Sequence, residues 1–123
     1  MIKRYSEDYL RDIKEGIELA IEFVEGLNFE EFCQDKKTIF AVTRAIQIIG
    51  EAVKKLPSSL REANPQIPWK DIAKMRDKVT HQYFAIKLDI LWETIKNDLP
   101  ILLSMIEPLL TELMENNENN ENE

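Results

Sequence analysis

The chain has few of the residues that tight turns, disulfides and metal sites require. Its 123 residues include three glycines, one cysteine and one histidine. So few glycines disfavour β-hairpins, which depend on repeated turns. The single cysteine, Cys33, cannot form a disulfide within the chain and fits a reducing cytosol. One histidine and one cysteine far apart in sequence do not make a zinc site, so we expect neither a metal nor a cofactor.

Long hydrophobic runs are also lacking. The first ten residues, MIKRYSEDYL, contain no apolar stretch of the kind found in signal peptides. The longest mostly apolar run, residues 99–106, is far shorter than the roughly 20 residues that cross a bilayer. We therefore expect a soluble, cytoplasmic protein without a membrane partner.

The charge of the chain is acidic and unevenly distributed. The net charge is −7, and the last nine residues, 115–123 (ENNENNENE), contribute four glutamates and no cation. This Asn/Glu tail has nothing to bury and is predicted to be disordered, which leaves one helical domain over residues 1–114. That domain has a charge of −3, which disfavours a generic nucleic-acid binder. A local basic pocket is still allowed, and its candidates are Lys70, Lys74, Arg76 and Lys78. For the three lysines, a solvated helix face is favoured over contacts with RNA.

Apolar residues recur three and four positions apart along most of the chain, as amphipathic helices require. The spacing predicts long helices over about 6–27, 38–56, 68–82 and 87–115, with a non-helical connector at 28–37. A short turn of helix is expected near Ser59, before a proline-rich extended stretch. The fold class is therefore all-α, an up-and-down bundle of four main helices with a short connecting helix.

Two of these helices have features with structural consequences. The apolar face of helix 38–56 is wide enough to contact more than one neighbour or a partner subunit, and Gly50 within it favours a close approach of another helix. Pro100 and Pro108 lie inside the last periodic segment, which predicts kinks or a break at Pro100.

The helix predicted at 68–82 holds the densest set of groups able to do chemistry. Asp77 and His81 are four residues apart, so the carboxylate can orient the imidazole. Arg76 and His81 are about 140° apart around one helix and about 7.5 Å apart along it, so they converge poorly. They could meet at one substrate if the helix unwinds near His81, or if a two-fold axis brings two copies of the segment together.

An arginine and a histidine together suit a phosphodiester. A histidine near neutral pKa can take or give a proton at the 2′-hydroxyl or at the leaving oxygen. An arginine offers a fork of donors to the phosphate oxygens as charge develops in the transition state. This chemistry needs no metal.

Simpler roles exist for each of these residues. A lone histidine such as His81, close to a helix end, is commonly a cap or a surface residue. Arg76 would ordinarily be an ion-pair partner, with Glu51 or Asp77 as its candidate partners. Tyr83 could be an interface or core aromatic whose hydroxyl reaches water. Glu51 could form a buried ion pair near the cleft or support the motif, and the sequence does not separate these two roles.

Several short elements resemble a known family. Residues 76–83, RDKVTHQY, are similar to the R-x4-H-x-Y signature of HepT-like proteins of the HEPN superfamily. Three other elements match family landmarks in the same order along the chain, and the resemblance covers about residues 3–110. These elements are Ile49-Gly50-Glu51-Ala52, Ile67-Pro68-Trp69 and Asp98-Leu99-Pro100.

The resemblance implies a HEPN bundle that forms a homodimer with its active cleft at the interface. It implies a metal-independent endoribonuclease that acts on RNA as the toxin of a type VII-like toxin–antitoxin pair. Arg76 and His81 would be catalytic, with Asp77 as the polar residue that follows the arginine. An MntA-like nucleotidyltransferase antitoxin would attach AMP to Tyr83, and the bulky anion would block phosphate binding. The alternative is a non-catalytic HEPN subunit that binds a nucleotidyltransferase as an adaptor.

Overall fold

The computed structural model describes residues 4–81 and 87–121, except for the side chains of residue 81 and of residues 118–121. Every regular element in the described part of the chain is helical, which confirms the all-α prediction. In order they are α1 (Ser6–Phe23), α2 (Phe29–Gln34), α3 (Lys36–Lys55), α4 (Ser58–Ala63), α5 (Trp69–His81), α6 (Leu88–Glu93), the π-helical segment η2 (Thr94–Asp98) and α7 (Leu99–Glu121).

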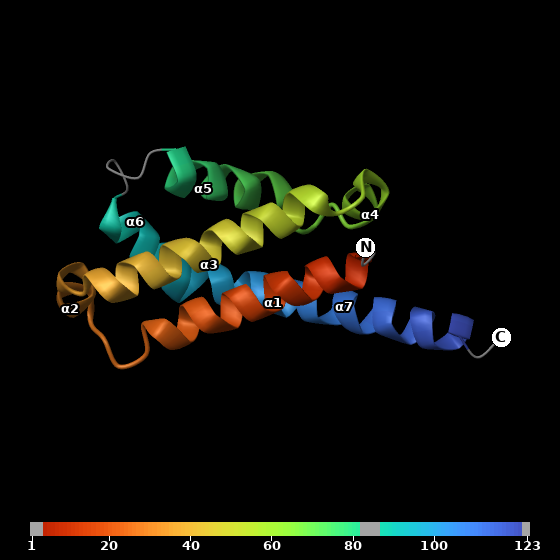
Figure 1. Ribbon diagram of the computed structural model, residues 1–123, viewed down its shortest axis with the longest axis horizontal. Coiled ribbons are helices and arrows are strands. Elements are labelled where there is room, and N and C mark those ends of the chain that lie inside the picture. The colour runs from red at the N-terminus through yellow and green to blue at the C-terminus, as the bar shows by residue number, and fades with distance from the viewer. Residues whose placement is uncertain (1–3, 82–86, 122–123) are drawn as a thin grey trace.

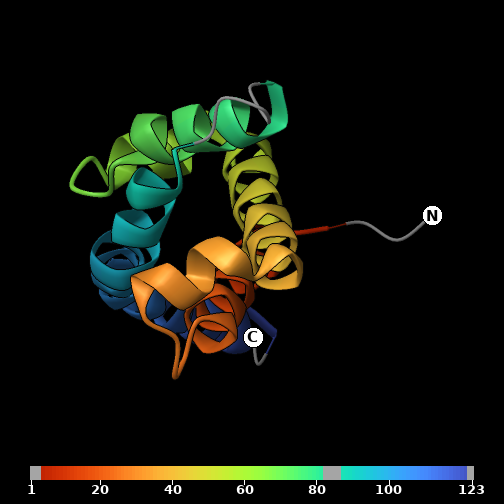
Figure 2. The same cartoon turned by 90° about the vertical axis from the view of Figure 1, so that its left-hand side faces the viewer.

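The long helices α1, α3, α5 and α7 form the bundle (Figure 1). α3 packs against α1 on one side and against α5 on the other, and α1 also packs against α7. Figure 2 shows α5 lying across α3, on the side away from α1. The wide apolar face of α3 therefore contacts two neighbours, as its sequence predicted.

The core lies in the seam between α1 and α3. Four residues of α1 that follow the helical repeat are completely buried, and Gly16 beside them lets α3 come close. A Cβ added at Gly16 would be 2.7 Å from Cγ1 of Ile49. The close contact excludes water along most of the seam, which stabilises the pairing of these helices. The four buried residues are Leu10, Ile13, Ile17 and Ala20.

The prediction that the connector at 28–37 breaks the helical pattern is wrong, because this segment contains the helix α2. Asn28 caps this helix: its side-chain oxygen accepts from the backbone N–H of Glu31 at 2.8 Å. The Glu31 carboxylate in turn accepts from the backbone N–H of Asn28 at 3.0 Å. Phe32 is buried and its ring lies 5.1 Å from that of Trp92, so α2 closes one end of the bundle.

The predicted break at Pro100 takes the form of a wider turn rather than an interruption. α6 passes directly into η2, and α7 begins at Leu99, one residue before the proline. A proline in a helix removes one hydrogen bond and crowds the carbonyl four residues before it, here that of Lys96. The π-helical turn gives that carbonyl room. α7 then continues past Pro108 to Glu121, while the division into a domain and a tail at residue 115 stays a prediction.

No helix among the described residues is both long enough and apolar enough to cross a membrane.

Candidate active site

The start of α5 is fixed by buried residues. Pro68 directly precedes the helix, where its missing N–H has no cost, and Ile67 and Trp69 on either side of it are buried. The indole N–H of Trp69 donates to the backbone oxygen of Asn64 at 3.0 Å. The position of the following motif therefore depends on a well-anchored first turn.

α5 packs on α3 through a row of residues that includes Arg76. Ile72 and Val79 are buried, and Arg76 follows the first by four residues and precedes the second by three. Residues at these spacings share one face of a helix. The backbone register therefore turns Arg76 toward α3, and only 20% of its side chain is exposed.

The closest approach between the two helices occurs where Gly50 of α3 meets Arg76 of α5. A Cβ added at Gly50 would overlap Cβ and Cγ of Arg76. Only a glycine leaves room for the arginine side chain at this point. The close helix contact that the sequence predicted at Gly50 is confirmed, and its partner is the motif arginine.

The guanidinium of Arg76 lies between two carboxylates. Its Nη1 donates to Oδ1 of Asp77 at 3.1 Å, and its Nη2 lies 3.8 Å from Oε1 of Glu51. Its Nε is buried without a hydrogen-bond partner in the described part of the chain. Of the two terminal nitrogens, Nη1 is engaged by Asp77, whereas Nη2 makes no hydrogen bond among the described residues.

Asp77 also connects the two helices. Its Oδ1 accepts from Nζ of Lys54 at 2.7 Å. The hydrogen bond from Lys54, and then the one from Arg76, hold the pKa of this carboxyl below its ordinary value of 3.8. Asp77 is therefore ionised at neutral pH.

The charges form an alternating row across α3 and α5. Arg44 lies 3.8 Å from Glu51, so the row runs from Arg44 through Glu51, Arg76 and Asp77 to Lys54. Three cations and two anions leave an excess of one positive charge beside the motif. Lys54 is not among the residues predicted for the site, although its position was a signal: it follows Glu51 by three residues and so shares its helix face.

The structure locates part of the predicted site. Arg76 and Asp77 are in direct contact, and both lie against α3. His81 is the last residue of α5, but its side chain lies outside the described residues. The predicted contact between Asp77 and His81 is therefore untested. Tyr83 also lies outside the described residues.

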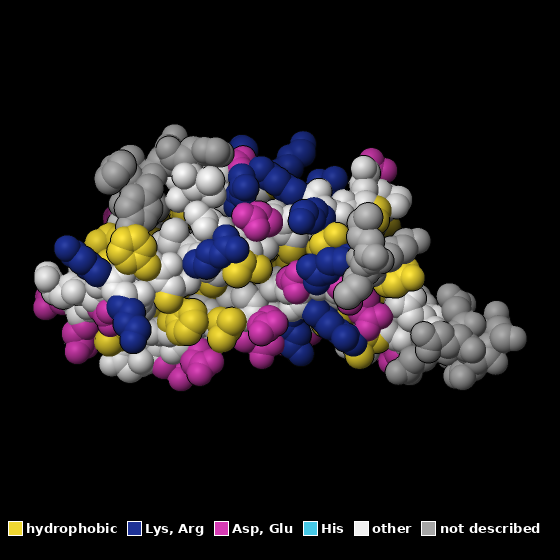
Figure 3. Space-filling view, in the orientation of Figure 1, with side chains coloured by type: hydrophobic (Ala, Val, Ile, Leu, Met, Phe, Trp, Pro, Cys, Tyr) yellow, Lys and Arg dark blue, Asp and Glu magenta, His cyan; other side chains and the backbone are white. Residues whose placement is uncertain are grey.

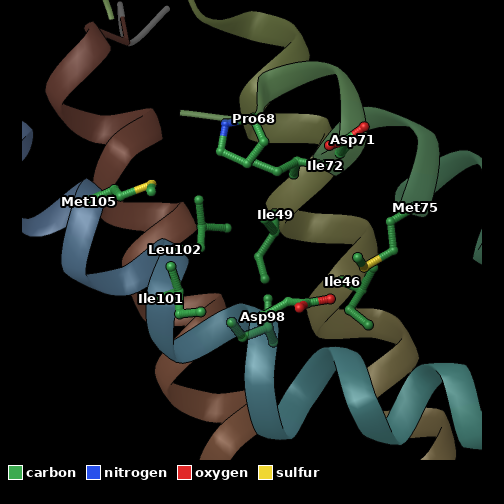
Figure 4. A pocket seen from close by; sticks show the side chains of 11 residues that line it. Ile46, Ile49, Pro68, Asp71, Ile72, Met75, Asp98, Ile101, Leu102 and Met105 are labelled. Atoms are coloured by element: carbon green, nitrogen blue, oxygen red, sulfur yellow. The ribbon is translucent and has the colours of Figure 1, made fainter. Parts of the chain in front are cut away.

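A separate apolar cavity of about 290 Å³ lies between α3, α5 and α7 (Figure 4). None of the residues of the charged row lines it, and its acidic groups are Asp71 and Asp98. Among the described residues, no group of three or more His, Cys, Asp or Glu side chains could hold a metal. The candidate active site is thus the charged seam between α3 and α5, outside this cavity.

An all-helical bundle that holds the motif arginine in a charged seam, five residues before a histidine, agrees with the HEPN-type fold and site that the sequence resemblance implies. The family model described as Ribonuclease HepT-like matches residues 13–109, so this chain belongs to that family.

Curated relatives match over nearly their whole length. A Thermococcus cleftensis protein named "Probable ribonuclease HepT" is 49% identical over 108 residues, which cover 88% of this chain and 98% of that protein. A Methanocaldococcus jannaschii protein named "Putative RNase MJ0127" is 40% identical over 119 residues, 97% of this chain and 98% of its own length. A Caldanaerobacter subterraneus protein named in the same way is 44% identical over 102 residues, 83% of this chain and 91% of that protein. No solved structure matches the chain.

Proposed function

We propose that this protein is a metal-independent endoribonuclease, the cytoplasmic toxin of a toxin–antitoxin pair. The observation that carries the proposal is Arg76, whose guanidinium lies between two carboxylates in a HepT-like chain and whose Nη2 makes no hydrogen bond among the described residues. Arginine binds phosphate oxygens through a planar fork of donors, and a fork already held in place needs no reorganisation during the reaction. The names of the relatives support RNA as the substrate.

In the proposed reaction, the 2′-oxygen of the RNA forms a bond to phosphorus while the bond to the 5′-oxygen breaks. His81 would take the proton from the 2′-hydroxyl or give one to the leaving oxygen. Arg76 would stabilise the additional negative charge on the phosphate oxygens in the transition state. Asp77 would hold the guanidinium and orient the imidazole.

A homodimer would complete this site. Arg76 faces α3, whereas position 81 lies about 140° further around the same helix, so the helix directs the two positions to different sides. A two-fold axis near α5 would place Arg76 of one subunit beside His81 of the other. α5 packs mainly on α3, which leaves another side of α5 for this contact.

The distribution of charge supports RNA binding over α3 and α5. These two helices contain nine Lys and Arg against three Asp and Glu, a net +6, whereas the rest of the chain has seven against twenty, a net −13. Figure 3 shows Lys and Arg side chains along the upper edge of the molecule, over α5. The negative net charge of the whole chain disfavoured nucleic-acid binding, but α3 and α5 together form a basic surface.

Regulation would act on the same motif. We infer that a nucleotidyltransferase antitoxin attaches AMP to Tyr83, which matches the tyrosine of the family signature. The added phosphate would bring negative charge and bulk near Arg76. Mass spectrometry of the chain, expressed with and without that enzyme, tests this: the mass of adenylate should appear on Tyr83 only in the first case.

The function itself is tested by RNA cleavage in EDTA. Wild-type protein should cleave, and His81→Ala and Arg76→Ala should each lose at least about 100-fold, as expected for a lost proton-transfer group or a lost charge-stabilising donor. Arg11→Ala on α1 is the matched control, because Arg11 pairs only with Glu7 among its described contacts, and it should stay active. Equal cleavage by all four proteins would refute the catalytic assignment. Absence of cleavage by wild type, with retained binding to a nucleotidyltransferase, would favour the adaptor function.

A further inference from the structure

We propose that Glu51 is a positioning residue, which acts on catalysis by holding the guanidinium of Arg76. This inference rests on the proposed function, because it requires Arg76 to serve the reaction. The sequence left two roles for Glu51 open, a buried ion pair or support of the motif. The ion pair is not a buried one, because 42% of the Glu51 side chain is exposed. The geometry combines the two, because Glu51 lies 3.8 Å from the motif arginine, as it also does from Arg44.

The place of Glu51 in α3 explains how it can act on Arg76. Glu51 follows Gly50, the residue over which the stem of Arg76 passes. It is also the only acidic residue of α3. The glycine fixes where the stem lies, and the adjacent carboxylate attracts the end of the side chain. Gly50 and Glu51 therefore control two different parts of one arginine.

The distance to Glu51 matters as much as its charge. At 3.8 Å the Glu51 oxygen attracts Nη2 but is too far to form a hydrogen bond with it. Nη2 therefore keeps its N–H groups for a phosphate oxygen, while Nη1 is held by Asp77. A carboxylate at this distance orients the guanidinium without occupying the donors that the reaction needs.

Glu51→Gln separates positioning from simple electrostatics. It keeps the size of the side chain and removes the negative charge. Loss of a negative charge beside an RNA site should by itself strengthen RNA binding and lower KM. Loss of positioning should lower kcat, because the guanidinium then meets the transition state less often. We expect kcat to fall about 10-fold while KM stays within about 2-fold or decreases.

A double-mutant cycle tests whether Glu51 acts through Arg76. In an Arg76→Lys background, which keeps the charge but loses the fork, Glu51→Gln should change kcat less than 2-fold. Glu22→Gln, an exposed glutamate on α1, is the matched control and should leave kcat unchanged in both backgrounds. If Glu51→Gln lowers kcat 10-fold both in the wild type and in the Arg76→Lys background, the proposal is overturned.

A second measurement does not depend on activity. The Nε–H of Arg76 is buried, so its exchange with water, followed by nitrogen-edited NMR, reports how firmly the side chain is held. Glu51→Gln should speed this exchange several-fold, and Glu22→Gln should not. Unchanged exchange in Glu51→Gln would overturn the positioning role. A wild-type protein that cleaves no RNA would refute the proposed function, whereas the NMR result would still decide whether Glu51 holds Arg76.

Discussion

At the scale of single residues, the site depends on one glycine as much as on its charged groups. Gly50 lies under the aliphatic part of Arg76, and nothing larger fits there without displacing it. The Gly50 backbone therefore confines the aliphatic part of the arginine, and two carboxylates confine its guanidinium. Its position is set before any substrate arrives, which is the condition for efficient charge stabilisation.

Gly50→Ala should therefore weaken both the fold and the proposed activity. The new methyl group overlaps Arg76, and overpacking of this kind costs about 1–3 kcal/mol, more than the roughly 1 kcal/mol that alanine gains in helix propensity. We expect a lower free energy of unfolding in urea. Cleavage per folded molecule should fall about 10-fold, because the guanidinium is displaced from a position whose loss costs 100-fold or more.

Gly26→Ala is the matched control for this prediction. Gly26 has a φ of +78°, with no atom within 4 Å of an added Cβ, so alanine there is strained but collides with nothing. It should lower the free energy of unfolding by about 1–2 kcal/mol and leave cleavage per folded molecule unchanged. An equal loss of cleavage in both variants would show that Gly50 acts only through stability.

At the scale of elements, the attachment of α5 to α3 combines an apolar contact with a polar connection at the surface. Ile72 and Val79 supply the buried part, and the Asp77–Lys54 hydrogen bond joins the helices at the edge. The connection joins residues 23 positions apart in sequence. It makes the motif helix sensitive to the ionisation of one carboxyl.

The lowered pKa of Asp77 predicts a specific pH dependence. A carboxyl whose pKa is lower in the folded than in the unfolded state stabilises the fold when ionised, fully above its unfolded value of 3.8. This stabilisation is lost as the pH falls through the folded pKa. Asp77→Asn should therefore reduce the free energy of unfolding at pH 7, and the difference from wild type should shrink at about pH 3.

Lys54→Gln identifies the cause of this pH dependence. The hydrogen bond from Lys54 is the largest contribution to the lowered pKa of Asp77. Its removal should therefore abolish most of the loss in free energy of unfolding that protonation of Asp77 causes at low pH. Urea unfolding at several pH values measures both variants. A Lys54→Gln protein that keeps the full wild-type dependence would contradict the assignment.

At the scale of the whole molecule, charge is separated between the helices. The basic pair α3 and α5 lies on one side of α1, and acidic residues predominate in the rest of the chain. On α5, the three exposed lysines Lys70, Lys74 and Lys78 recur every four residues and form one row along the helix. An RNA backbone would be attracted to this side and repelled from the other.

The salt dependence of RNA binding tests this arrangement. Lys74→Gln and Lys78→Gln should each reduce the slope of log affinity against log salt concentration by about 0.7, the value for one lost phosphate contact with a single strand. Lys14→Gln on α1 removes the same charge from the acidic side and should leave the slope unchanged. If all three variants have the same slope, the lysines of α5 do not contact the RNA.

Much of the fold was predictable because helix formation follows from local spacing. The apolar repeat predicted the four long helices, and the resemblance at residues 76–83 identified Arg76 and Asp77, which the structure brings into contact. The connector at 28–37 was misassigned because its apolar residues are few. The Asn28 and Glu31 capping pair was the signal that a helix begins there.

The sequence alone determined that this chain is helical, which faces of its helices are apolar, and which family signature it carries. Those properties depend on residues a few positions apart. Only the tertiary structure decided that Gly50 gives room to Arg76, that Glu51 and Lys54 complete its charged surroundings, and that the basic residues share one side. The reason is physical: these contacts join α3 and α5, and the angle and register of two packed helices are set by how their side chains fit together.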